Sequence, residues 1–333
     1  MIQDFDEDVL PALLDWRTRD DAGALVTLVR KTRSGPRPLG AQLAVSVRGE
    51  VVGLISGGCV EGGIAEEARA AMTEGRNRFA RFGEGSRYVD LRMPCGGSID
   101  VYVDATVATG TLADVAEAVA ARRAAVLATD TATGETRVEA PQEGDDAAFA
   151  TAELVWPTES LFRRLHRPPP RLILAGRGPI VPLAAQMGAL NGYRVEVLTD
   201  DSHVAGQTAP ACAAPVRGTG PGDVGAVAID PATAVVTLFH DHDVELPLLR
   251  RALESPAFHI GALGSQTTQA ARLARLADEG YSEQALTRIE GPAGVPIHAA
   301  NPAEIATSII AGVIRAYRAG RPPVTAARDR PEM

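Results

Sequence analysis

Leu172-Ile173-Leu174-Ala175-Gly176-Arg177-Gly178-Pro179 is the stretch that decides the fold of the C-terminal half. Its apolar run predicts a buried strand, and the glycines after it predict a tight turn into a helix. In such a turn, Gly176 permits unusual backbone angles. Gly178 lets the main chain approach a phosphate, whose charge then lies at the helix N-terminus. The stretch therefore predicts a Rossmann-like nucleotide-binding fold.

Two positions near this turn bear on the ligand. Asp200 follows the predicted strand 194–198, at the place where dinucleotide-binding folds carry the acid that binds a ribose. Val181 stands where the GxGxxG pattern has its third glycine. The sequence therefore predicts the fold more firmly than the ligand, and a bound NAD(P) stays an open alternative.

Beyond residue 170, apolar strands alternate with helices. The predicted strands are 171–175, 194–198, 234–239 and 259–263, and the predicted helices are 180–191, 245–254, 266–278 and 302–318. This alternation predicts an α/β domain over residues 170–320, with a parallel sheet and helices on both faces. Residues 321–333 are rich in proline and arginine, and we expect a disordered tail there.

The N-terminal half predicts a second, separate domain, since 333 residues exceed one ordinary core. Its predicted elements are a helix over 8–20, a hairpin of 41–47 with 51–55, a helix opening at 59–61 and an alanine-rich helix over 111–123. We predict a mixed α/β domain over residues 1–166. The consecutive prolines Pro168, Pro169 and Pro170 keep the backbone stiff and extended, and we place the boundary there.

Composition excludes several classes of function. A net charge of -9 argues against nucleic-acid binding, and no apolar run reaches the length of a membrane span. Lys31 is the only lysine, and it lies outside any GxxxxGK[ST] motif, which argues against phosphate-loop ATPases and Schiff-base enzymes. The acidic N-terminus is unlike an export signal, so we expect a cytoplasmic protein with reduced cysteines.

Two cysteines lie beside paired glycines. Ser56-Gly57-Gly58-Cys59-Val60-Glu61 places Cys59 between a glycine turn and a helix start, where backbone N–H groups and the helix dipole favour the thiolate. Cys95-Gly96-Gly97 mirrors this motif. We predict Cys59 and Cys95 to be reactive thiols, with Glu61 beside the first. A small apolar residue packed under a turn is the alternative for Cys59, and it is the interpretation we give to Cys212.

A polar cluster follows the predicted strand 235–239. His240-Asp241-His242-Asp243 lies at a carboxyl end, where open α/β sheets bind ligands. It could hold a metal, orient a substrate, transfer protons or form a hydrogen-bonded polar turn. No second ligand cluster is evident, so we predict no metal centre. Gly264-Ser265 forms another strand-to-helix turn suited to backbone contact with an anion.

Together these motifs resemble the XdhC/CoxI family of xanthine dehydrogenase accessory proteins. The resemblance is carried by 37–41, 55–61 and 95–97 in the N-terminal half and by 240–242, 260–265, 292–295 and 301–306 in the C-terminal half. Three positions depart from the family pattern. Phe239 stands where a threonine is usual, Gln266 where an arginine is usual, and Glu245 where an aspartate is common.

The resemblance implies a maturation factor for molybdenum hydroxylases. Such a protein binds molybdenum cofactor (molybdopterin), supports its sulfuration and delivers it to the apoenzyme. We therefore expect a chaperone rather than a turnover enzyme, with the apoenzyme and a cysteine desulfurase as partners, in a homodimer. Cys59, Cys95 and Glu61 are the predicted catalytic residues. The predicted cofactor-binding residues are Gly57, Gly58, Gly96, Gly97, Gly176, Gly178, Asp200, His240, Asp241, His242, Gly264 and Ser265.

Two other functions stay open. An NAD(P)-dependent oxidoreductase is favoured by the Rossmann turn, but the third glycine is missing and the single Lys31 excludes a Tyr-xxx-Lys pair. The second open function is a scaffold that recruits a cysteine desulfurase and binds no cofactor of its own.

We hypothesise one composite site, in which Cys59 and Cys95 face His240, Asp241 and the turn at 264–265. The sequence leaves open whether this site forms within one chain or across a dimer, and which hydroxylase is the client.

Overall fold

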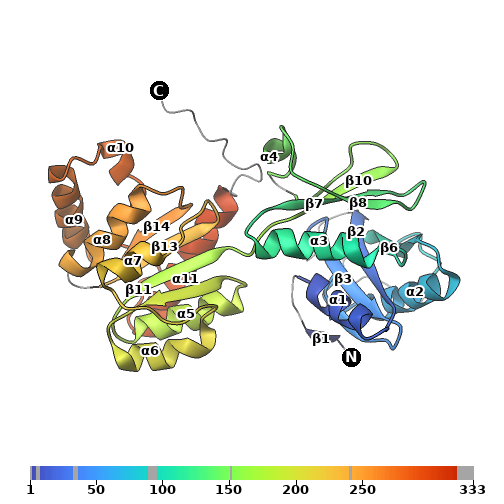
Figure 1. The fold of residues 1–333 in the computed structure, drawn as a ribbon, viewed down its shortest axis with the longest axis horizontal. Helices are drawn as coiled ribbons and strands as arrows, with labels where there is room; N and C mark the ends of the chain where they lie inside the picture. Colours follow the sequence, from blue (N-terminus) through green and yellow to red (C-terminus); the bar gives the residue numbers. More distant parts are fainter. Residues whose placement is uncertain are drawn as a thin grey trace. The chain divides into compact units, whose positions relative to one another are not determined.

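The chain divides between Pro168 and Pro169 into two compact units, which we call unit 1 and unit 2 (Figure 1). The computed structural model describes residues 2–4, 8–32, 37–88, 96–150, 152–239 and 242–320. The predicted tail, 321–333, lies outside these residues. Within the described ranges, no helix has the length and apolar character needed to cross a membrane.

Unit 1 is built on a six-stranded, mainly antiparallel sheet. Its strands in spatial order are β1 (Ile2–Asp4), β4 (Val51–Gly53), β3 (Gln42–Ser46), β2 (Gly23–Lys31), β6 (Ser98–Asp104) and β5 (Arg78–Gly83). Side chains alternate between its faces. Val26 and Leu28 pack with helix α2 (Glu61–Glu74), whereas Leu25 packs with α1 (Leu10–Thr18) and α3 (Thr109–Ala120).

A second, four-stranded antiparallel sheet completes unit 1. It runs in the order β8 (Thr136–Glu139), β7 (Ala125–Asp130), β10 (Leu161–His166) and β9 (Leu154–Val155), with the short α4 (Asp145–Ala148) beside it. Tyr102 of β6 meets Phe162 of β10 edge to face, with ring centroids 5.5 Å apart. The two sheets of unit 1 therefore share a small aromatic core.

The mixed α/β prediction for the N-terminal half is confirmed. The predicted hairpin is formed by β3 and β4, and the first predicted helix is α1. We did not predict β5 from the sequence, because Arg78 and Arg81 interrupt its apolar pattern and only Ala80 and Phe82 are buried.

Unit 2 holds a five-stranded sheet whose strands are all parallel. The order is β12 (Arg194–Leu198), β11 (Arg171–Gly176), β13 (Thr233–Leu238), β14 (His259–Ala262) and β15 (Ile289–Glu290). The main helices are α5 (Ile180–Leu190), α8 (His242–Leu253), α9 (Gln266–Asp278) and α11 (Pro302–Ala319), and the short ones are α6 (Ser202–Thr208), η1 (Ala209–Ala211), α7 (Pro221–Ala226) and α10 (Glu283–Leu286).

Helices cover both faces of this sheet (Figure 1). Leu172 and Leu174 face α5 and α11, whereas Ile173 and Val235 face α8 and α9. This arrangement confirms the Rossmann-like parallel-sheet domain.

The strand order reverses between β11 and β13. In doubly wound folds this reversal marks the crevice where ligands bind, at the carboxyl ends of the strands. Gly176, the last residue of β11, pairs with Leu238 at the end of β13. A Cβ atom on Gly176 would lie 2.6 Å from the Leu238 Cβ and 2.8 Å from its carbonyl oxygen.

The two glycines of the turn are required for different reasons. Gly176 has no left-handed φ and is required by its close approach to Leu238, so the prediction of unusual backbone angles there is wrong. Gly178 is the residue with left-handed backbone, at φ 77°, and it has open space where a Cβ would lie.

Gly176→Ala should destabilise unit 2 by about 1–3 kcal/mol, because the added methyl overlaps the Leu238 backbone. Gly178→Ala is the matched control, expected to lose about 1 kcal/mol from backbone strain alone. Urea unfolding followed by far-UV circular dichroism measures both. Equal losses would contradict the close-approach role of Gly176.

Candidate functional site

The first predicted thiol lies on a glycine turn between β4 and α2. Gly57 and Gly58 have φ angles of 95° and 102°, which glycine adopts without strain. Gly57, Gly58 and Cys59 are exposed, while the flanking Ser56 and Val60 are buried. The turn thus presents its central residues to solvent and anchors its two ends in the core.

The Glu61 carboxylate organises this turn. It is 2% exposed. Its Oε1 accepts hydrogen bonds from the backbone N–H groups of Ile55 and Ser56, at 3.2 and 2.7 Å. Its Oε2 accepts from Ser56 Oγ at 2.6 Å and from the N–H groups of Gly58 and Val60 at 3.0 and 3.2 Å. Burial alone would raise the pKa of Glu61, but these hydrogen bonds outweigh it and hold the pKa below its ordinary value.

Glu61 therefore acts as a positioning residue for the turn, since both carboxylate oxygens face its amides. Those amides already have an acceptor, so an anionic ligand would have to compete with Glu61 for Gly58 and Val60. The catalytic role that the sequence analysis predicts for Glu61, beside the Cys59 thiol, stays a prediction.

Cys59 is the cysteine with an exposed thiol among the described residues. Its backbone N–H donates to Ser56 Oγ at 3.1 Å, which fixes its main chain directly before α2. The alternative, a cysteine packed under the turn, is wrong. Cys212 is half-buried, and burial raises the pKa of its thiol. Cys95 lies outside the described residues.

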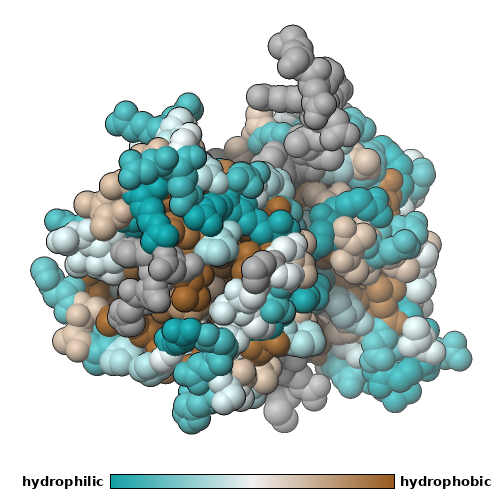
Figure 2. Space-filling view, turned by 60° about the vertical axis from the view of Figure 1, so that its left-hand side comes forward, coloured by the Kyte–Doolittle hydropathy of each residue, from teal (hydrophilic) through white to brown (hydrophobic). Residues whose placement is uncertain are grey.

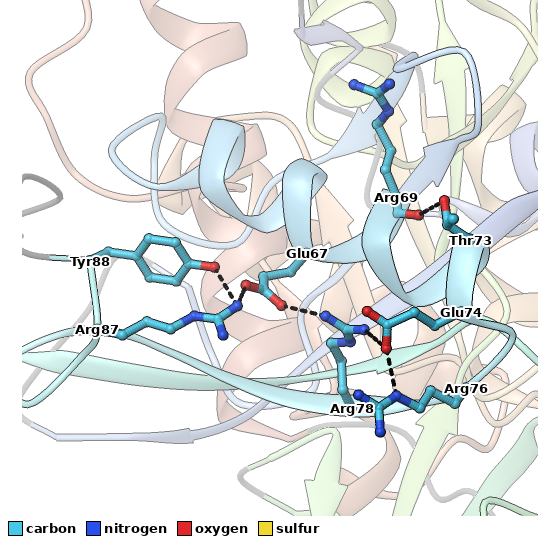
Figure 3. Close-up of polar contacts among 8 residues, drawn as sticks. All are labelled: Glu67, Arg69, Thr73, Glu74, Arg76, Arg78, Arg87 and Tyr88. Carbon is cyan, nitrogen blue, oxygen red and sulfur yellow. Dashed lines mark hydrogen bonds and ion pairs between the residues drawn. The ribbon is translucent and has the colours of Figure 1, made fainter.

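Helix α2 also anchors residues 87–88. Glu67, buried on α2, accepts from Arg78 Nη1 at 3.2 Å and from Arg87 Nη2 (Figure 3). Arg87 Nη2 also donates to the Tyr88 hydroxyl at 3.0 Å, and the Tyr88 ring stacks on Phe82 of β5 with centroids 5.1 Å apart. Helix α2 therefore holds both the Cys59 turn, through Glu61, and residues 87–88.

The described chain resumes at Gly96, which has a left-handed φ of 64°. The carbonyl of Gly97 accepts a hydrogen bond from the Glu84 N–H at 3.2 Å. The second glycine pair thus lies beside the end of β5.

In unit 2, the predicted ribose acid has a partner within the chain. Arg177 Nε donates to Asp200 Oδ1 at 2.6 Å, and a second guanidinium nitrogen contacts Oδ2. These hydrogen bonds lower the pKa of Asp200. The guanidinium also lies 5.8 Å from the Phe239 ring centroid. Arg177 therefore links the carboxyl ends of β11, β12 and β13, and a ribose hydroxyl would compete with it for Asp200.

Val181 is fully buried in the core between α5 and the sheet. The glycine of the GxGxxG pattern lets the helix pack close to the strand at this position, and Val181 fills that space with a side chain. This observation weakens the dinucleotide alternative further.

A buried polar network lies between α8, α9 and the ends of β13 and β14. Arg272 of α9 is buried, and its Nε donates to Glu245 Oε1 of α8 at 2.8 Å. Arg272 Nη2 donates to the Leu263 carbonyl at 2.7 Å, and Thr237 Oγ1 donates to Glu245 Oε2 at 2.9 Å. The network fixes α8 and α9 to the ends of β13 and β14. His240 and Asp241 lie outside the described residues, and His242 is the first residue of α8.

Sequence reasoning missed Arg272. It shares a buried face of α9 with Gln269 and Leu276, at helical spacing. The arginine among apolar positions of the predicted helix could have indicated this network, because a buried guanidinium needs a carboxylate partner.

Ser265 is the N-cap of α9, and its Oγ accepts from the Thr268 N–H at 3.1 Å. The residue is exposed, and Gly264 before it has a φ of 143°. The structure therefore shows the predicted strand-to-helix turn, with one helix N–H already satisfied by Ser265.

The described residues bring together no group of three or more His, Cys, Asp or Glu side chains that could hold a metal ion. Among the described residues, the candidate ligand-binding features are the exposed Cys59 on its turn in unit 1 and the glycine turns at strand ends in unit 2.

Comparison with known proteins assigns this architecture to a family. Residues 16–83 match the family model described as XdhC and CoxI family, and residues 172–313 match the one described as XdhC Rossmann domain. The chain belongs to the XdhC/CoxI family. It is 34% identical over 289 residues to the molybdenum cofactor insertion chaperone PaoD of Escherichia coli strain K12, covering 87% of this chain and 81% of PaoD.

Two further relatives are more distant. The chain is 24% identical over 299 residues to the uncharacterized protein YqeB of the same E. coli strain, covering 88% of this chain and 43% of YqeB. A crystal structure from Bacillus halodurans, named a xanthine dehydrogenase, superposes with a TM-score of 0.74 at 22% identity. That match covers 93% of this chain and 96% of the other, and it shows the shared fold.

Glu61→Gln should lower the free energy of unfolding by about 3 kcal/mol, because an amide cannot accept all the hydrogen bonds that the charged carboxylate accepts. Since folding lowers the pKa of Glu61, its stabilisation is complete above the unfolded pKa and is lost as pH falls through the folded one. The variant should therefore lose less stability than wild type between about pH 5 and 3. Urea titrations across that range measure this difference.

Glu66→Gln is the control, because Glu66 is exposed on the same helix. It should follow the wild-type pH profile. If Glu61→Gln followed that profile too, the Glu61 carboxylate would not be the group that organises the turn.

Proposed function

We propose that this chain binds molybdenum cofactor and inserts it into a molybdenum hydroxylase apoenzyme. The observation that carries the proposal is the 34% identity, over 87% of the chain, to a protein named a molybdenum cofactor insertion chaperone. The matched family models fall in both units, so the relationship is not limited to a shared Rossmann domain. The cofactor is cargo here, and the chain hands it on rather than turning over a substrate.

Cys59 is the residue we assign to contact with the cofactor's sulfur-bearing end. Its thiol is exposed, and its main chain is fixed by Ser56 and Glu61. A fixed main chain needs no reorganisation when a ligand arrives, which favours capture. We assign Cys95 the same role. A cysteine desulfurase is the proposed partner that supplies sulfur while the cofactor is bound.

The glycine turns of unit 2 suit the anionic end of the cofactor. Gly178 leaves open space beside its backbone at the start of α5, and helix N-termini favour phosphate. We assign Gly176, Gly178, Gly264 and Ser265 to this role. We also assign His240, Asp241 and His242, which follow β13 in the sequence, to cofactor binding.

An NAD(P)-dependent oxidoreductase is the second candidate, favoured by the glycine turn at the strand-order reversal. The Arg177–Asp200 pair and the buried Val181 argue against it. The absorption spectrum of the purified protein separates the two functions, since a bound pterin and a bound nicotinamide absorb differently.

Cys59→Ser should fold normally but lose at least about tenfold in cofactor affinity, because serine removes the thiol and keeps the shape of the turn. The measurement is molybdenum by mass spectrometry and pterin by fluorescence, on protein purified from cells that make the cofactor. Cys212→Ser is the matched control and should keep the wild-type content, since Cys212 is half-buried in the other unit. Equal cofactor content in all three proteins would remove Cys59 from the site.

A further inference from the structure

One edge of the unit 1 sheet is built to accept another strand. Among the strands that the structure describes, β5 is the terminal one of its sheet and pairs with β6 alone. Among the described edge strands it is the longest, since β1, β8, β9 and β15 are shorter, and β12 carries bridges at Val195 and Leu198 to Cys212 and Arg217. A long edge that no described strand pairs with presents N–H and C=O groups that another chain can use.

The register of the sheet identifies which backbone groups face this edge. Glu84 N–H donates to the Gly97 carbonyl directly beyond β5, so residue 84 bonds toward β6. Antiparallel ladders alternate along a strand. Ala80 and Phe82 therefore bond toward β6, whereas the N–H and C=O groups of Phe79 and Arg81 point outward.

The side chains on this edge are also suited to contact. Phe79 is 46% exposed, one of few described large apolar side chains with such exposure, the others being Val47, Leu190 and Ile297. On the face of unit 2 that comes forward in Figure 2, hydrophobic residues lie in small groups among hydrophilic ones. Arg81 lies two residues after Phe79, on the same face of β5, and its side chain is 50% exposed. Asp100 holds its guanidinium by hydrogen bonds of 2.6 and 2.8 Å.

We infer that β5 pairs antiparallel with β5 of a second copy of this chain, about a two-fold axis at Ala80. In that register the outward groups of Phe79 meet those of Arg81 of the partner subunit, and each such pair exchanges both N–H···O bonds. Directly opposite residues share a face of the sheet. The Phe79 ring therefore lies beside the guanidinium of Arg81 of the partner subunit, a favourable cation–π pair made twice by symmetry.

A second copy fits this edge because the strand is complementary to itself. The aromatic ring and the cation that pair across the axis come from one strand, two residues apart. Asp100 neutralises Arg81, so the two symmetry-related arginines do not repel as free charges. The inference goes beyond the proposed function and does not rest on it.

Hydrogen exchange of the wild-type chain tests the pairing at low and high protein concentration. Exchange of the Phe79 and Arg81 amides should slow as concentration rises, because only the dimer gives them acceptors. Exchange at Ala80 and Phe82 should be slow at every concentration, which makes them internal controls on the same strand. Concentration-independent exchange at Phe79 and Arg81 would overturn the inference.

Sedimentation of three variants tests the register. Arg81→Pro removes the outward N–H, and proline is tolerated on an edge strand when its nitrogen faces outward. It should raise the dimer dissociation constant at least about tenfold more than Arg81→Ala, which keeps that N–H. Phe79→Arg should weaken the dimer, because it removes the ring that contacts Arg81 of the partner subunit and adds an unneutralised cation beside it, whereas Phe79→Glu should still dimerise. A monomeric wild type, or a dimer indifferent to Arg81→Pro and Phe79→Arg, would overturn the inference.

Discussion

The hydrogen bonding of one buried carboxylate determines the geometry of the thiol-bearing turn. Glu61 accepts hydrogen bonds from the turn before it while standing as the first residue of α2. A buried charge is tolerated only when such donors replace water. Because the carboxylate fixes both the turn and the start of the helix, Cys59 stays exposed on a rigid support. The same helix then places Glu67 to hold Arg78 and Arg87.

Unit 2 uses a comparable device at its strand ends. The Arg272–Glu245 pair is buried and bonds to Thr237 and to the Leu263 carbonyl, so its charges are paired and its remaining donors are used. Removing one partner of such a pair leaves an uncompensated charge, at a cost of about 3–5 kcal/mol. In both units, a buried ionic group therefore fixes the position of a helix relative to the strand ends or turn beside it.

Much of the fold could be predicted from the sequence, and less of the site. The parallel sheet of unit 2 follows from the alternation of apolar strands and helices. Its four main helices lie within a few residues of their predicted bounds, whereas the short helices α6, η1, α7 and α10 were not predicted. The Arg177–Asp200 pair could not be predicted, because the two residues lie on successive strand ends and meet only in the folded sheet. The role of Gly176 was misjudged for the same reason, since Leu238 is its neighbour only across β11 and β13. Glu61 was identified, but its hydrogen bonds with the turn depend on backbone angles that the sequence does not specify.

The central claim is that this chain delivers molybdenum cofactor to an apoenzyme. The direct measurement is transfer between two purified proteins: the chain loaded with cofactor, and a molybdenum hydroxylase produced without it. The account predicts that hydroxylase activity appears without added free cofactor, and that molybdenum leaves the chain in proportion to the activity gained. Molybdenum that stays on the chain, with an apoenzyme that remains inactive, would contradict the account.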